Sequence, residues 1–289
     1  MSDSGPRTVR ANGLSHLVRQ WGDEASAHTF VLCHGFLDQS LSFRGVGERL
    51  AERGARAFAF DWRGHGQTEW VGAGGYYHFV DYVLDLHELL PQLTEGPVHL
   101  CGHSMGGTAV AMFAATHPER LRTVTLVEGL GPPGFGGEAP DKILDWLQSV
   151  DRVRRGDPKK PMTDLDDAVR RLRGMNKELP EPLARELAST GTQPGPNGEG
   201  LVWSFDPLHR TTSPSVFDAA VFETFLRRIA APTLIVNGQH GFRTPDHAAR
   251  VAALPNAVEI TIESAGHMIH QSQPVVLADA IFEHALAHG

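Results

Sequence analysis

The sequence predicts an α/β fold built on a mostly parallel sheet, and two observations lead to it. Short apolar runs rich in β-branched and aromatic residues recur along the 289-residue chain, and helical patterns separate them. Such alternation is typical of βαβ units, in which helices cover both faces of a parallel sheet. With a hydrophobic content of 41%, a chain of this length can bury the core of a large domain.

We expect eight strands, one at each apolar run. They fall at residues 9–11, 16–21, 29–32, 57–60, 98–101, 123–127, 233–237 and 258–262. Helices are expected between and after them, at residues 42–53, 79–93, 244–254 and 274–287. The second of these has a broad apolar face at helical spacing. The third opens on Thr244 and Pro245, a capping residue followed by proline at the first helical position.

Residues 131–228 break this rhythm and predict an inserted cap. The segment holds amphipathic patterns at 142–153 and 164–175, the latter with Thr163 as its expected cap, and a loop rich in glycine and proline at 193–200. We therefore expect a core domain of residues 1–131 and 229–289. A helical cap of residues 132–228, without a core of its own, would be inserted between strands six and seven.

Charge and composition exclude several kinds of partner. The chain has 26 basic and 34 acidic residues, for a net charge of −8, which disfavours binding to nucleic acid. No apolar stretch approaches the ~20 residues that span a bilayer, and the first residues lack the apolar segment of a signal peptide. We therefore expect a cytoplasmic protein with no membrane insertion, and the oligomeric state stays open.

The two cysteines point to packing. Cys33 and Cys101 each lie inside an apolar strand run, so buried free thiols are expected in place of a disulfide. No cysteine spacing typical of a metal site occurs in the chain.

A glycine-bracketed serine between a strand and a helix is the most specific functional signal. Residues 102–106, GHSMG, match G-x-S-x-G, with an apolar strand run before them and a small-residue helical run after them. A sharp turn here lifts the Ser104 hydroxyl above the sheet, and the glycines avoid a Cβ clash with neighbouring chain. The next helix points its first amides at the place where an attacked carbonyl would gather negative charge. Ser104 is therefore predicted to be a nucleophile.

Together with three other motifs, this turn resembles the α/β-hydrolase superfamily. HGF at 34–36, DWRGHG at 61–66, the serine turn and GH at 266–267 come in its order and spacing, over nearly the whole chain. The resemblance implies an eight-stranded sheet and an oxyanion hole made by the N–H groups of Phe36 and Met105. It also implies a structural turn, not catalysis, for Asp61 and His65. HGFLDQSLSF at 34–43 is similar to the HGW-x-DN-x-x-SF motif of the serine-hydrolase-like branch.

The serine needs a base, because an alcohol is a weak nucleophile until a neighbouring imidazole accepts its proton. His267 follows the last strand in a loop at the carboxyl edge of the sheet, where ligands bind in such folds. The superfamily pattern of glycine then histidine in this loop favours His267 as the base. His270, three residues later, is the competing candidate.

The predicted acid departs from the commonest superfamily pattern. Many relatives carry aspartate shortly after the seventh strand, and Gly241 stands at that place here. Some superfamily members place the acid at the end of strand six, where this chain has Glu128. Glu128 also lies between Ser104 and His267 in the chain, as the expected order requires. We predict a Ser104–His267–Glu128 triad; Asp246, Asp206 or no acid at all are the alternatives.

A serine nucleophile predicts acyl transfer, since the dehalogenase and epoxide hydrolase relatives attack with aspartate. The predicted function is hydrolysis of a small-molecule carboxylic ester without a cofactor. Lactone opening, carbon–carbon bond hydrolysis and cofactor-free perhydrolysis use the same residues and stay open, as does a non-catalytic ligand-binding protein. The residues that either line an acyl pocket or form cap core are Trp146, Trp203, Phe205, Leu208 and His209.

Overall fold

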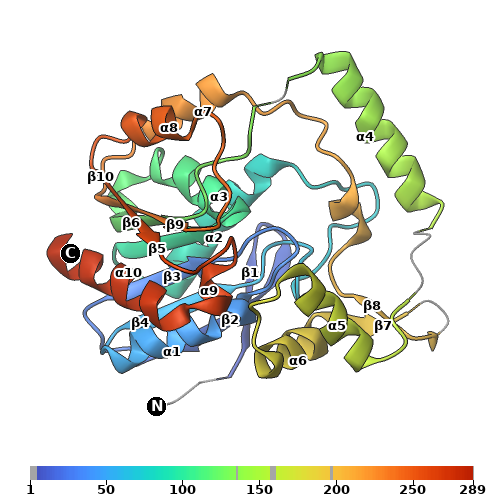
Figure 1. Cartoon of the computed structure of the whole chain (residues 1–289), viewed down its shortest axis with the longest axis horizontal. Helices are drawn as coiled ribbons and strands as arrows, with labels where there is room; N and C mark the ends of the chain where they lie inside the picture. Colours follow the sequence, from blue (N-terminus) through green and yellow to red (C-terminus); the bar gives the residue numbers. More distant parts are fainter. Residues whose placement is uncertain (1–4, 135, 157–160, 196–197, 289) are drawn as a thin grey trace.

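The computed structural model describes residues 5–134, 136–156, 161–195 and 198–288. Its centre is an eight-stranded sheet in the order β1-β2-β4-β3-β5-β6-β9-β10 (Figure 1). β2 pairs antiparallel with both β1 and β4, and all other neighbours in the sheet pair parallel. The predicted fold class is therefore confirmed. The sheet strands are β1 Arg7–Ala11, β2 Leu14–Trp21, β3 Thr29–Cys33, β4 Arg56–Phe60, β5 Val98–His103, β6 Leu121–Val127, β9 Thr233–Gly238 and β10 Ala257–Ile262.

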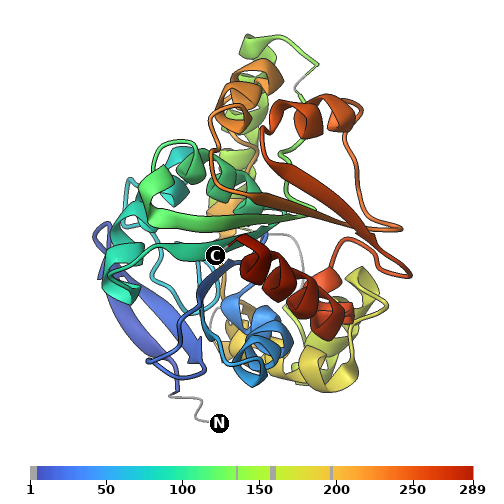
Figure 2. The ribbon, with the colours of Figure 1, turned by 90° about the vertical axis from the view of Figure 1, so that its left-hand side faces the viewer.

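Helices cover both faces of the sheet because buried side chains project from both sides of its central strands. On one face lie α2 (Phe79–Leu93) and α3 (Met105–Ala114), and on the other α1 (Arg44–Glu52) and α10 (Pro274–His288), which pack side by side (Figure 2). In the described part of the chain no helix is long and apolar enough to cross a membrane. Along the chain, the shorter helix α8 (His247–Ala253) precedes β10 and the shorter helix α9 (Ile269–Ser272) follows it.

Cys33 and Cys101 are buried free thiols, as predicted, and lie on the neighbouring parallel strands β3 and β5. They belong to different apolar clusters on opposite faces of the sheet. Burial raises the pKa of Cys101 to about 12 and that of Cys33 well above its usual value. Both thiols are therefore protonated at neutral pH and act as packing residues.

Between β6 and β9 the chain forms helices and one small hairpin, and Figure 1 shows α4 apart from α5 and α6. These elements are α4 Ala139–Arg154, α5 Leu165–Met175, α6 Glu181–Thr190, β7 Thr192–Pro194, β8 Leu201–Trp203 and α7 Ala219–Leu226. The segment was expected to lack an independent core, and its helices α5 and α6 share one buried apolar cluster. The apolar sides of α5 and α6 pack together, and all members of the resulting buried cluster except Leu41 come from the inserted segment.

Local details differ from the sequence-based expectations at three places. Asp164, not Thr163, caps α5, because its carboxylate accepts the Asp167 N–H at 2.8 Å. The helix expected from Thr244 starts at His247, after a turn in which the Thr244 carbonyl accepts the His247 N–H. The expected loop at 193–200 is bracketed by the β7–β8 hairpin.

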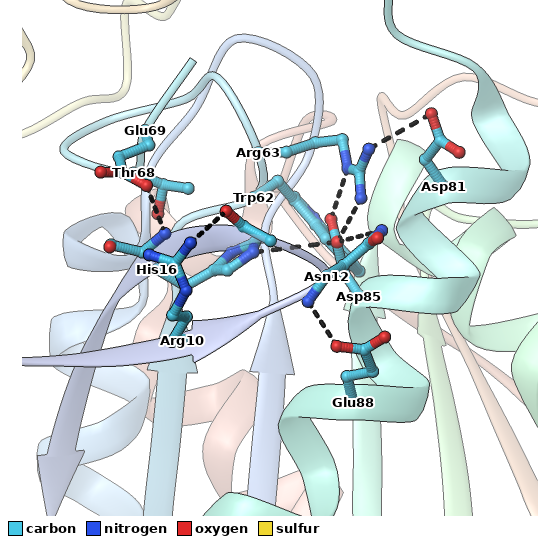
Figure 3. Close-up of polar contacts among 12 residues, drawn as sticks. Arg10, Asn12, His16, Trp62, Arg63, Thr68, Glu69, Asp81, Asp85 and Glu88 are labelled. Atoms are coloured by element: carbon cyan, nitrogen blue, oxygen red, sulfur yellow. Dashed lines mark hydrogen bonds and ion pairs between the residues drawn. The ribbon is translucent and has the colours of Figure 1, made fainter. Parts of the chain in front are cut away.

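The DWRGHG loop after β4 is anchored by a buried ion pair (Figure 3). Arg63 contacts Asp85 of α2 at 2.5 and 2.8 Å, and their side chains are 6% and 0% exposed. Asp61 accepts backbone N–H groups from Ser40 at 2.6 Å and Gln67 at 2.8 Å. The motif thus ties the β4 loop to α2 and to the loop after β3.

The Asp85→Ala variant is expected to lose about 3 kcal/mol of unfolding free energy. The buried Arg63 guanidinium would lose its two bonds to Asp85 and keep the contact with the partly exposed Asp81 at 3.2 Å. The matched control is Glu48→Ala, which removes an exposed pair with Arg44 and should change stability by less than about 0.5 kcal/mol. Urea unfolding followed by circular dichroism measures both. Equal effects of the two variants would contradict a structural role for the buried pair.

Candidate active site

Ser104 sits on a strained turn between β5 and α3. Its backbone has φ 52° and ψ −116°, a left-handed conformation that is rare outside glycine. The Ser104 N–H donates to the Val127 carbonyl at 2.9 Å, which fixes the turn to β6. A Cβ at Gly106 would lie 2.5 Å from the carbonyl oxygens of Cys33 and His34, so only glycine fits there. The turn therefore requires the glycine-bracketed sequence.

His267 bridges Ser104 and Glu128. Its Nε2 lies 3.0 Å from Ser104 Oγ, and its Nδ1 lies 3.1 Å from Glu128 Oε2. A carboxylate only accepts hydrogen bonds, so Nδ1 carries a proton and a neutral ring presents its Nε2 lone pair to the serine. The His267 side chain is 39% exposed, whereas that of Glu128 is fully buried.

Glu128 is held by the end of β9 and the loop that follows it. Its Oε1 accepts the Gly238 N–H at 2.7 Å and its Oε2 accepts the Phe242 N–H at 2.8 Å. Each carboxylate oxygen thus accepts one backbone N–H, and hydrogen bonds to a carboxylate are among the stronger ones in proteins. A Cβ at Gly241 would lie 1.8 Å from Glu128 Oε1. The Glu128 carboxylate thus occupies the space that a side chain at position 241, where many relatives carry aspartate, would need.

The other acidic candidates bind elsewhere. Asp246 pairs with Arg250 at 2.8 and 2.9 Å. Asp206 accepts the Tyr77 hydroxyl at 2.8 Å and the Leu208 N–H at 2.9 Å. His270, the competing base, lies 3.0 Å from a carboxylate oxygen of Asp38. Of these groups and Glu128, the structure brings Glu128 to His267.

The two expected oxyanion donors lie next to Ser104. Met105 is the first residue of α3, so helix geometry gives its N–H no partner within the helix. Phe36 follows β3 in a loop that passes close to the serine, since a Cβ on Gly35 would come within 3.2 Å of Ser104 Cβ. The Phe36 ring itself is half exposed and lines the same cavities as Ser104 and His267.

Two cavities meet at Ser104. The first, of about 540 Å³, is mainly aromatic and apolar. The second, of about 860 Å³, combines apolar walls with polar side chains, including Gln39, Asn176, Arg210 and Gln271. Both are also lined by Phe36, His209, Thr211 and His267. Ser104 therefore lies where the two cavities adjoin.

Four of the five predicted pocket residues line these cavities. Leu208 lines the first, Trp203 and Phe205 line the second, and His209 lines both. Burial lowers the pKa of His209 to about 4, so its ring is neutral at pH 7. Trp146 is outside the linings that the described residues form, and it packs edge-on against Tyr76 with ring centroids 5.3 Å apart.

Sequence reasoning missed an aromatic wall of the first cavity. It consists of Tyr76, Tyr77, Phe79 and Tyr82, from the loop before α2 and from α2 itself. The only signal was the adjacent tyrosine pair after a glycine-rich stretch, VGAGGYY at 71–77. Those residues precede the serine turn, and nothing in the chain order links them to the inserted segment.

Residues 28–274 match the family model described as the alpha/beta hydrolase fold. The match covers most of the 289-residue chain, and the protein belongs to this family. Hydrolysis is the general activity that this membership supports.

Relatives and solved structures agree with that assignment. The 2-(acetamidomethylene)succinate hydrolase of Mesorhizobium japonicum is 26% identical over 277 residues, covering 95% of this chain and 93% of that protein. The serine hydrolase-like protein of Danio rerio is 35% identical over 102 residues, covering 35% of this chain and 31% of that protein. The thioesterase domain from the curacin biosynthetic pathway has the same fold, with a TM-score of 0.85, 24% identity and coverage of 96% and 98%.

The Gly241→Ala variant is expected to lower the reactivity of Ser104 at least about tenfold, because the added Cβ would displace the Glu128 carboxylate from His267. A matched control is Gly72→Ala, since the space around Gly72 is open. Second-order rates of labelling by a fluorophosphonate measure the effect. Equal rates in the two variants would contradict the proposed dependence of Ser104 on Glu128.

Proposed function

We propose that this protein hydrolyses carboxylic esters of small molecules through an acyl-enzyme formed on Ser104. The observation that carries the proposal is the unbroken set of contacts from Ser104 Oγ through His267 to Glu128, at 3.0 and 3.1 Å. A serine nucleophile, a base within hydrogen-bond reach and a buried acid that orients the base are the elements of acyl transfer. The proposal uses no cofactor.

In the proposed reaction, Ser104 Oγ attacks the ester carbonyl while His267 Nε2 accepts the hydroxyl proton. The N–H groups of Phe36 and Met105 stabilise the tetrahedral oxyanion. His267 returns its proton to the leaving alcohol, and the acyl group stays on Ser104. Water then attacks the acyl-enzyme, with His267 again as the base, and releases the carboxylic acid. Glu128 stabilises the imidazolium in both steps.

The two cavities support a division of the substrate. The acyl group would occupy the smaller aromatic cavity, and the alcohol the larger cavity with its polar side chains. We place the cap at residues 132–228, with residues 1–131 and 229–289 as the core. Leu208 would then be the cap residue that limits the acyl chain, because it lines the smaller cavity beside Thr211 and Ser213.

The first test labels the purified protein with a fluorophosphonate and locates the adduct by mass spectrometry. We expect an adduct on Ser104 that is lost in His267→Ala, because an unactivated serine reacts slowly. Folding of the variant is checked by circular dichroism. A folded, unlabelled wild-type protein would contradict the proposal and favour a ligand-binding role.

Glu128→Gln separates the role of the acid from that of the base. The variant keeps the size of the side chain but cannot stabilise the imidazolium, and a loss of roughly 10⁴ in kcat is expected by analogy with other serine triads. The measurement is steady-state hydrolysis of nitrophenyl esters. An unchanged rate would remove Glu128 from the mechanism.

The Leu208→Trp variant is expected to shift the preference toward short acyl chains, because the larger ring fills part of the aromatic cavity. The loss in kcat/KM for long-chain relative to acetyl esters should be on the order of tenfold. Trp203→Ala, in the larger cavity, is the control and should leave the acyl-chain profile unchanged. The opposite pattern would exchange the assignments of the two cavities. Thioesters, lactones and carbon–carbon substrates complete the screen.

A further inference from the structure

A second set of ligand-type side chains lies beside the Ser104 turn. Asp38 follows Phe36 by two residues, His103 directly precedes Ser104, and His270 follows His267 by three residues. One nitrogen or oxygen of each lies within 4.8 Å of the others. His103 and His270 are buried, and the Asp38 side chain is 9% exposed. None of the three has a role in the proposed reaction.

Both histidines have an imidazole nitrogen with no hydrogen-bond partner among the described residues. His103 Nε2 lies 2.9 Å from the His267 carbonyl, which only accepts, so Nε2 carries the proton and Nδ1 is a bare lone pair. His270 Nε2 likewise donates to Asp38 at 3.0 Å, and its Nδ1 is buried and unpaired. Buried polar atoms are rarely left so.

Gly35 lies against the unpaired Nδ1 of His103. A Cβ at Gly35 would lie 2.7 Å from His103 Nδ1, so a side chain at position 35 would crowd this atom. Gly35, Asp38 and His103 also line the larger cavity, which gives an ion a path to the cluster.

We propose that Asp38, His103 and His270 form a binding site for a divalent transition-metal ion, best suited to Zn²⁺. Two imidazoles and one carboxylate form a ligand set that favours Zn²⁺ over the hard cations Mg²⁺ and Ca²⁺. Tetrahedral ligands with ~2.1 Å bonds lie about 3.4 Å apart. From separations of up to 4.8 Å, the side chains need to close by about 1.4 Å at most. The fourth position would be open toward the cavity.

Occupation of this site inhibits hydrolysis. The ion joins the loop of Phe36 to the segment that carries His267, so it restricts an expected oxyanion donor and the base together. Its positive charge also opposes the formation of the His267 imidazolium during acylation. This consequence rests on the proposed function, whereas binding of the ion does not.

Isothermal titration of the chelator-treated protein with Zn²⁺ tests the site directly. We expect one bound ion, a rise in the thermal midpoint with Zn²⁺ concentration, and visible absorption bands of a four-coordinate site when Co²⁺ replaces Zn²⁺. His270→Gln and Asp38→Asn should each raise the Kd for Zn²⁺ at least about tenfold. Ester hydrolysis by the wild type should fall on addition of Zn²⁺ and recover with EDTA.

Two controls locate the ion. His87 and His117 form an exposed histidine pair at 3.0 Å, and His87→Gln should leave the Zn²⁺ affinity unchanged. Ser104→Ala should also leave it unchanged, which excludes an ion held at the serine and His267. Lost binding in either control, or retained binding in His270→Gln and Asp38→Asn, would overturn the site.

The wild-type measurements decide the case even if a variant misfolds. Absence of Zn²⁺ binding, of a stabilised thermal midpoint and of Co²⁺ bands in the folded wild type overturns the proposal. If Zn²⁺ binds as expected but no fluorophosphonate adduct forms, the metal site stands and the proposed hydrolysis fails. If the adduct forms without Zn²⁺ binding, the reverse holds.

Discussion

The buried carboxylate of Glu128 connects the loops of three strands, and the rest of the site depends on it. It directly follows β6, accepts one amide from the last residue of β9 and one from the loop after β9, and contacts the ring of His267 after β10. Each hydrogen bond from a backbone amide to a charged acceptor contributes on the order of 1.5 to 3 kcal/mol to stability. Since the carboxylate has no exposed surface, these donors and the histidine replace the water that it loses on folding. The same carboxylate therefore both orients the His267 ring and joins the loops.

The parallel sheet explains why such distant residues meet. β3, β5, β6, β9 and β10 are consecutive in the sheet and run in the same direction. Their carboxyl ends therefore share one edge, where ligands bind in open α/β sheets. Phe36, Ser104, Glu128 and His267 each follow one of these ends. The strained left-handed backbone at both Ser104 and Glu128 is where the chain leaves the strand plane to aim a side chain at the edge.

Burial also sets the charge around the nucleophile. Desolvation lowers the pKa of His34, His65, His103 and His209, so these rings stay neutral at pH 7. Unlike these rings, His267 contacts both Ser104 and the Glu128 carboxylate.

The sequence alone determined the features that local geometry demands. The apolar alternation specified the sheet, and the glycines specified the turn that carries Ser104, because backbone clashes at Gly106 forbid other residues. Glu128 could only be one candidate among several, since choosing it required the loop after β9 to fold around its carboxylate. The tertiary structure decided the two cavities, the tyrosine wall, the place of Trp146 outside the cavity linings, and the Asp38–His103–His270 cluster. They depend on contacts between segments far apart in the chain, which no local pattern records.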